Sequence, residues 1–127
     1  MATVHREPNQ VKWVGVRPGH NGEQILVKIE LAGNAIVYTV PANKILFLFD
    51  WHIGIARGVA GAAELQIRDD AAAIHAYLSY VTSAAGYTGT NATQNLWVPH
   101  ELIEAWDIYV VTGNPVRGYI HGILIDA

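Results

Sequence analysis

The chain contains no cysteine among its 127 residues. This absence excludes disulfide bonds, thiolate metal sites and a cysteine nucleophile. Charge is also scarce: 15% of the residues are Asp, Glu, Lys or Arg, and the 8 basic side chains are outnumbered by 11 acidic ones. A net charge of -3 does not supply the basic field that neutralises a run of phosphates, so we expect no nucleic-acid partner.

Long apolar runs are missing as well. The longest, residues 45–49, is far shorter than the roughly 20 residues that span a bilayer. Residues 1–10 lack the apolar core of about 7 to 15 residues that a secretory signal has. We therefore expect a soluble protein with no membrane partner. The mean hydropathy is nevertheless +0.19, which is high for a small monomer and predicts that some apolar surface is buried against other chains.

What the sequence does contain is alternation of period two, the pattern of strands. Over residues 24–31 every second side chain is apolar, as in a strand with one exposed face. Gly33-Asn34 tolerates positive φ and predicts a hairpin to a strand over 35–40. Over 44–56 the odd positions are large and apolar, so we expect this face to be the spine of the core. Further strands are expected over 12–16, 64–68, 96–98, 107–111 and 117–125.

Residues 71–85 fit two secondary structures. Ile74, Leu78 and Val81 recur at helical spacing, and Asp70 is a suitable residue for a helix N-cap. The even positions also suit a strand, and Asp69-Asp70 is typical of a turn between two strands. The β-rich context favours the strand, because one helix would interrupt the sheet. The sequence thus predicts an all-β sandwich of about eight or nine antiparallel strands, with an extended arm over 1–11 and the domain over 12–127.

Three segments carry a resemblance to a known family. Residues 38–44 read YTVPANK, residues 97–110 read WVPHELIEAWDIYV, and residues 118–122 read GYIHG. In this order they resemble the Y-T-V-P-A-G-K step, the segment before a strand and the G-x-I-x-G final strand of small jelly-roll structural proteins of tailed-phage virions. Asn43 and Ala105 stand where glycine is usual. Asparagine tolerates a left-handed backbone, whereas the alanine predicts a negative φ at 105.

The resemblance implies a jelly-roll fold and a structural role in a virion. We expect a capsid decoration or cement protein, a homotrimer that binds the major capsid protein and stabilises the head. It would be assembled in the host cytoplasm and located in the virion. The alternative is a receptor-binding fibre-tip domain that recognises a surface glycan. A chain that starts at Met1 with no fibrous segment ahead of the sandwich favours decoration.

Two groups of residues are candidates for contact with partners. The arm carries Val4, His5, Arg6 and Glu7. With only one large apolar residue after Met1, the arm cannot pack by itself, so we expect it to extend onto a capsid subunit or a neighbouring chain, a disordered tail being the alternative. Aromatic side chains near loops offer flat apolar faces to a glycan or another partner, and here they are Tyr87, Trp97 and Trp106.

Residues for catalysis or metal binding do not form a recognisable pattern. The six histidines are scattered singly, with no H-x-H or H-E-x-x-H pair. Asp50 and His52 share one face of the expected strand, but such a polar pair more often meets water or another chain. We expect no catalytic residue, no metal site and no cofactor, and therefore a protein that is not an enzyme.

Overall fold

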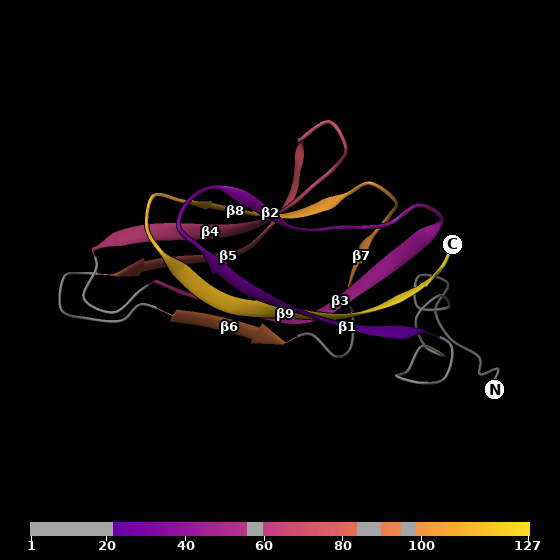
Figure 1. Cartoon of the computed structure of the whole chain (residues 1–127), viewed down its shortest axis with the longest axis horizontal. Helices are drawn as coiled ribbons and strands as arrows, with labels where there is room; N and C mark the ends of the chain where they lie inside the picture. Colours follow the sequence, from indigo (N-terminus) through magenta and orange to yellow (C-terminus); the bar gives the residue numbers. More distant parts are fainter. Residues whose placement is uncertain (1–21, 56–59, 84–89, 95–98) are drawn as a thin grey trace.

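The computed structural model describes residues 22–55, 60–83, 90–94 and 99–127, which form a β-sandwich of two antiparallel sheets (Figure 1). The strands are β1 (Glu23–Leu31), β2 (Ala35–Thr39), β3 (Lys44–Ile55), β4 (Gly61–Arg68), β5 (Ile74–Ser83), β6 (Thr90–Gln94), β7 (His100–Leu102), β8 (Asp107–Thr112) and β9 (Val116–Asp126). One sheet has the order β1-β9-β3-β6, with β7 also paired to β3, and the other has the order β2-β8-β4-β5. The described residues contain no helix.

The strand pairs are nested, which makes the sandwich a jelly roll. β1 pairs with β9, β2 with β8, β3 with β6 and β7, and β4 with β5. This is the pairing of one long hairpin, whose tip is the β4–β5 turn, wrapped into two facing sheets. In Figure 1 the labels of β2, β8, β4 and β5 lie along one side of the sandwich, and those of β1, β9 and β6 lie along the other. The predicted all-β sandwich is confirmed.

Most of the predicted strands are present, within one to three residues at their ends. The expected strands over 12–16 and 96–98, and the arm over 1–11, lie outside the described residues. The strand interpretation of 71–85 is confirmed by β5. Its pairing with β4 shifts register between Leu65 and Gln66 and again between Ile67 and Arg68. Each shift changes the phase of the alternation, which explains why a strand carries apolar residues at helical spacing.

The predicted hairpin at Gly33-Asn34 is wrong. β1 and β2 do not pair with each other, because β1 lies in one sheet and β2 in the other. The turn carries the chain across the sandwich, and Asn34 Oδ1 accepts a hydrogen bond from the Thr112 backbone N–H at 2.7 Å. A permissive turn is needed both in a hairpin and in a connection between sheets, so the local residues do not distinguish the two.

The prediction that the odd positions of β3 form one face is also wrong. The pairing with β9 passes from Leu48↔Gly122 directly to Asp50↔His121, so Phe49 is an extra residue in a bulge. After it, Trp51 and the odd positions up to Ile55 point into the sandwich, but before it the even positions Leu46 and Leu48 do so.

Phe47 and Phe49 instead form a second cluster with Ile123 on the outer face of the sheet. Ile45 and Ile125 pack against this outer cluster. Phe47 is only 1% exposed, although it does not belong to the main core.

The main core lies between the two sheets. Its largest fully buried members include Ile29, Leu65 and Ile108, which come from β1, β4 and β8. Trp51 is also buried here, and its Nε1 donates a hydrogen bond of 2.9 Å to Ser79 Oγ on β5. This bond crosses from one sheet to the other, and it satisfies an indole N–H that burial would otherwise leave unpaired.

The predicted negative φ at Ala105 is wrong. Its φ is 68°, in the left-handed region, and Asn43 has a φ of 62°. Two backbone hydrogen bonds account for the turn: Ala105 N–H donates to Val40 C=O at 3.0 Å, and Val40 N–H donates to Trp106 C=O at 2.9 Å. The segment after β2 and the segment before β8 are thus joined, at the cost of strain in the alanine backbone.

Candidate functional site

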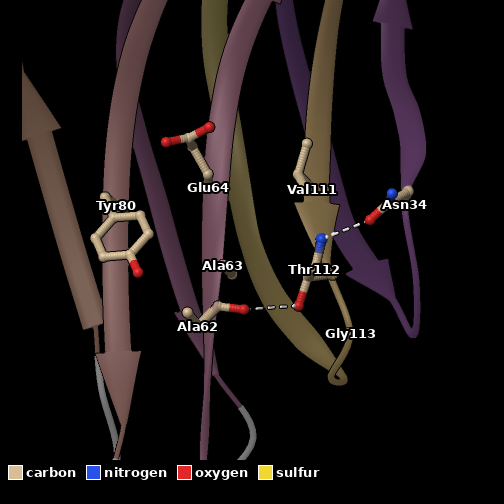
Figure 2. Close-up of a pocket in the computed structure, with 8 residues that line it drawn as sticks. All are labelled: Asn34, Ala62, Ala63, Glu64, Tyr80, Val111, Thr112 and Gly113. Carbon is tan, nitrogen blue, oxygen red and sulfur yellow. Dashed lines mark hydrogen bonds between the residues drawn. The ribbon is translucent and has the colours of Figure 1, made fainter.

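The outer face of the β2-β8-β4-β5 sheet carries a pocket of about 450 Å³. It is lined by Asn34, Ala62, Ala63, Glu64, Tyr80, Val111, Thr112 and Gly113. Figure 2 shows Tyr80 on one side, Glu64 and Ala62 on the central strand β4, and Thr112 and Asn34 on the other side. We call this pocket the Tyr80 groove.

Strand pairing and one small side chain open the groove. Glu64 on β4 is directly opposite Tyr80 on β5, so both side chains point to the same face of the sheet. Two residues earlier on β4, Ala62 places only a methyl group on that face. The surface over Ala62 is therefore recessed, and the neighbouring Tyr80 side chain is 62% exposed.

A chain of contacts along β4 holds Glu64. Glu64, Gln66 and Arg68 are two residues apart and share one face. Arg68 Nε donates to Gln66 Oε1 at 2.9 Å, and Gln66 Nε2 donates in turn to Glu64 Oε1. The Arg68 guanidinium carbon lies 3.7 Å from the centre of the Tyr109 ring. These contacts restrict the Glu64 carboxylate before any ligand arrives.

The opposite wall is held by Thr112 and Asn34. Asn34 Oδ1 accepts from the Thr112 N–H, and the Thr112 hydroxyl lies within hydrogen-bond distance of two carbonyl oxygens, Asn114 at 3.0 Å and Ala62 at 3.3 Å. The carbonyl oxygen of Asn34 is thereby used, while its Nδ2 makes no hydrogen bond to any residue in the described part of the chain. The amide N–H groups remain available as donors at the edge of the groove.

The outer face of the other sheet carries a second pocket, of about 440 Å³, lined by Leu26, Lys28, Gly118 and Tyr119. We call it the Leu26 patch. Leu26 is 69% exposed and Tyr119 is 36% exposed. The His52 ring stacks against Tyr119 with 5.9 Å between ring centres, so the aromatic wall of the patch is fixed.

A polar network borders the Leu26 patch on one side. The Gln24 side-chain nitrogen lies 2.9 Å from His121 Nε2, and His121 Nδ1 lies 3.2 Å from Asp50 Oδ2. An amide nitrogen can only donate, so Nε2 accepts and the proton of the neutral ring is assigned to Nδ1, which donates to Asp50.

Ion pairs border the other side of the patch. Lys28 Nζ lies 3.6 Å from Glu30 Oε1, and Arg117 Nε lies 3.7 Å from Glu30 Oε2. Strand pairing sets Lys28 opposite Tyr119. It sets Glu30 opposite Arg117 as the next pair on the same face. An apolar centre with a polar margin is typical of a surface that meets another protein.

A third group lies at the β4–β5 turn. Asp69 Oδ1 accepts hydrogen bonds from the backbone N–H groups of Ala71 and Ala73, and His75 Nε2 lies 2.9 Å from Asp69 Oδ2. The hydrogen bond with His75 and then that of Ala73 hold the pKa of the Asp69 carboxyl below its usual value. The His75 ring also stacks on Trp106, with centres 4.2 Å apart. This group stabilises the turn.

The residues expected to contact partners are mostly not placed. Val4, His5, Arg6, Glu7, Tyr87 and Trp97 lie outside the described residues. Trp106 is half-buried, packs against the main core and is stacked by His75. These contacts cover part of the Trp106 side chain, and its expected contact with a partner stays a prediction.

Sequence reasoning did not single out Tyr80, Glu64 or Leu26. The sequence signal that could have found them is a polar or large side chain at an outward-facing position of a strand in which polar and apolar residues alternate. For Tyr80 that signal was obscured by the register shifts in β5, which move Tyr77 and Tyr80 to one face although they are three residues apart. Leu26 stands among polar alternate positions of β1 and would be expected to face water.

Asp50 and His52 do share the outer face of β3, as predicted, but they contact different partners, His121 and Tyr119. In the described ranges, no group of three His, Asp or Glu side chains is arranged to hold a metal ion. No helix among the described residues is long and apolar enough to cross a membrane. No protein-family model matches this chain, and no curated protein matches its sequence.

Proposed function

We propose that the protein is a non-enzymatic structural protein of a virion, a capsid decoration protein that acts as a homotrimer and stabilises the head by binding the major capsid protein. The resemblance of residues 38–44, 97–110 and 118–122 to phage jelly-roll proteins motivates this role. The observation that carries it is the Leu26 patch, an apolar surface with a polar margin on the outside of the sandwich.

Exposure of Leu26 is costly unless something covers it. Burying a leucine side chain is worth roughly 1.5–3 kcal/mol, and 69% of Leu26 is accessible. Lys28 is already paired with Glu30, and His121 with Asp50. A partner that covers Leu26 therefore does not need to supply an opposite charge for these groups. An apolar surface with paired charges at its margin suits contact with another folded chain.

The neighbouring sheet edge offers a further contact. β1 has nine residues, and within the described part of the chain it pairs only with β9. Among the described residues, no strand hydrogen-bonds to the other edge of β1, which lies next to the Leu26 patch. A partner that covers Leu26 can also hydrogen-bond to this edge.

The location is tested by electron microscopy of virions carrying a labelled copy of the protein. We expect the label on the capsid surface. Label at a fibre tip would replace decoration with receptor binding, and absence of label from particles would overturn the virion role.

The patch is tested with Leu26→Ser, and Ile74→Ser serves as the matched control because Ile74 is also exposed, at 40%, but lies on the other sheet. Light scattering gives the mass in solution, and occupancy is measured on particles. We expect Leu26→Ser to dissociate the trimer or to reduce occupancy with the trimer intact. A monomeric wild-type protein, or a Leu26→Ser variant unchanged in both measurements, would contradict the proposal.

A further inference from the structure

We propose that the Tyr80 groove is a carbohydrate-binding site that takes a neutral pyranose unit of a glycan. The inference goes beyond the proposed capsid role, since the groove lies on the opposite outer face from the Leu26 patch. It uses residues of β4, β5 and β8 together with Asn34, which lies between β1 and β2, and none of the loop aromatics considered from the sequence.

Tyr80 supplies the stacking surface of the groove, and Tyr77 lies farther along the same face of β5, outside the residues that line the groove. Tyr80 is 62% exposed and Tyr77 is 67% exposed, and both lie on the outer face of β5 opposite Glu64 and Gln66. One face of a pyranose ring consists largely of C–H groups, which pack on an aromatic ring with little loss of hydration. Neither tyrosine hydroxyl makes a hydrogen bond to another described residue, so both rings are open to a ligand.

The polar groups around Tyr80 match sugar hydroxyls. Glu64 uses Oε1 to accept from Gln66, and its Oε2 has no partner within the described ranges. That oxygen can accept from a hydroxyl, while Asn34 Nδ2 on the opposite wall can donate to one. An acceptor on one wall and a donor on the other match a sugar ring, because each of its hydroxyl groups can both donate and accept a hydrogen bond.

The groups are held in place before binding. Gln66 is 3% exposed and joins Arg68 to Glu64, so the carboxylate is supported by a buried amide. The Asn34–Thr112 hydrogen bond fixes the other wall. Because little side-chain freedom remains to be lost, weak individual contacts with a sugar can add to measurable affinity.

Charge and size select the ligand. Among the described residues that line the groove, Glu64 is the one with a carboxylate, and none is a lysine or an arginine. A sugar acid would meet like charge, whereas a neutral sugar would not. The volume of about 450 Å³ lies within the range of small-ligand sites, roughly 300–1,000 Å³.

Binding is tested by NMR titration of the ¹⁵N-labelled full chain with three neutral oligosaccharides, cellohexaose, maltohexaose and chitohexaose, and with one acidic probe, hexagalacturonate. We expect saturable shifts at the backbone amides of Ala62, Glu64 and Thr112 with at least one neutral probe. The acidic probe should bind at least about tenfold more weakly. No saturable shift with any neutral probe up to about 10 mM, or tighter binding of the acidic one, would overturn the proposal.

Variants separate stacking from folding. Tyr80→Ala should raise Kd by about tenfold or more, and Tyr80→Phe, which keeps the ring, should remain within about threefold of wild type. Ala62→Leu should fill the floor and block binding with Tyr80 still present. Ile103→Ala truncates an apolar side chain that is 47% exposed and lies outside both the Tyr80 groove and the Leu26 patch, so it is the control and should bind as wild type does.

The same variants exclude a protein occupant. If Tyr80→Ala dissociates the oligomer measured by light scattering, the groove is a subunit contact and the carbohydrate proposal fails. If Tyr80→Ala is correctly folded and binds the oligosaccharide with wild-type affinity, the proposal fails as well. Neither result would affect the test of the Leu26 patch, which measures oligomer mass and particle occupancy with a different variant.

Discussion

Phe47 and His52 lie on the same outer face of β3, although they are five positions apart and regular alternation would put them on opposite faces. The bulge at Phe49 adds one residue and thereby reverses the alternation between them. As a result, β3 contributes Leu46, Leu48 and Trp51 to the main core, and Phe47 to a separate outer cluster.

The two clusters are expected to respond independently to mutation. Phe47→Ala should reduce the free energy of unfolding by about 3–5 kcal/mol, since the ring is 1% exposed and its loss leaves a cavity. His52→Ala, on the same face but half-buried, should cost less. Urea denaturation measures both, and a cost below about 1 kcal/mol for Phe47→Ala would show that the outer cluster does not stabilise the fold.

Additivity provides a sharper test of this separation. Ile123→Val in the outer cluster and Ile108→Val in the main core should each cost about 0.5–1.5 kcal/mol. Their double variant should equal the sum within about 0.5 kcal/mol, because the two side chains share no neighbours. A larger coupling energy would indicate that the two clusters act as one.

Strain at the alanines with positive φ should be relieved by glycine. Ala72 has a φ of 65° and is exposed in the β4–β5 turn, so Ala72→Gly removes steric strain without loss of packing. We expect a gain of about 0.5–1 kcal/mol in the free energy of unfolding, and a similar gain for Ala105→Gly. Ala71→Gly is the control, because Ala71 lies in the same turn and has no positive φ, and it should not stabilise the protein.

Gly118 should tolerate no side chain. A Cβ there would lie 1.8 Å from His52 O on β3, so Gly118→Ala must push two central strands apart. We expect a loss of about 1–3 kcal/mol or more, measured by denaturation. Gly33→Ala, where a Cβ meets nothing within 4 Å, is the matched control and should be close to neutral. Equal stability of the two variants would contradict the close approach of β9 to β3.

Stability should fall as the pH drops below neutrality. Burial lowers the pKa of His100, whose ring lies 5.6 Å from that of Trp51. The unfolded chain therefore takes up this proton at a higher pH than the folded chain does. The stabilisation is complete above the ordinary histidine pKa of about 6.5 and is lost as the pH falls from there through the folded pKa.

Urea titrations at about pH 7.5 and pH 5.5 measure this dependence. His100→Gln should make the decrease in unfolding free energy smaller than in the wild type. The same decrease in both proteins would assign the pH dependence to other groups.

Strand positions could be predicted from the sequence because the alternation of polar and apolar side chains is a local property of each strand. The pattern over 24–31 located β1, and the turn residues Asp69-Asp70 located the β4–β5 hairpin. The Asn43 backbone conformation was also readable, since asparagine is suited to positive φ. The composition predicted exposed apolar surface without showing where it lies.

Pairing, bulges and sites were decided only by the tertiary structure. Gly33-Asn34 permits a turn, but whether β2 returns beside β1 or crosses to the other sheet depends on β8 and β9, which are distant in sequence. The bulge at Phe49 is fixed by the register with β9, and a shift of one residue moves every later side chain to the other face. The Tyr80 groove likewise exists only because hydrogen bonding between β4 and β5 sets Tyr80 opposite Glu64.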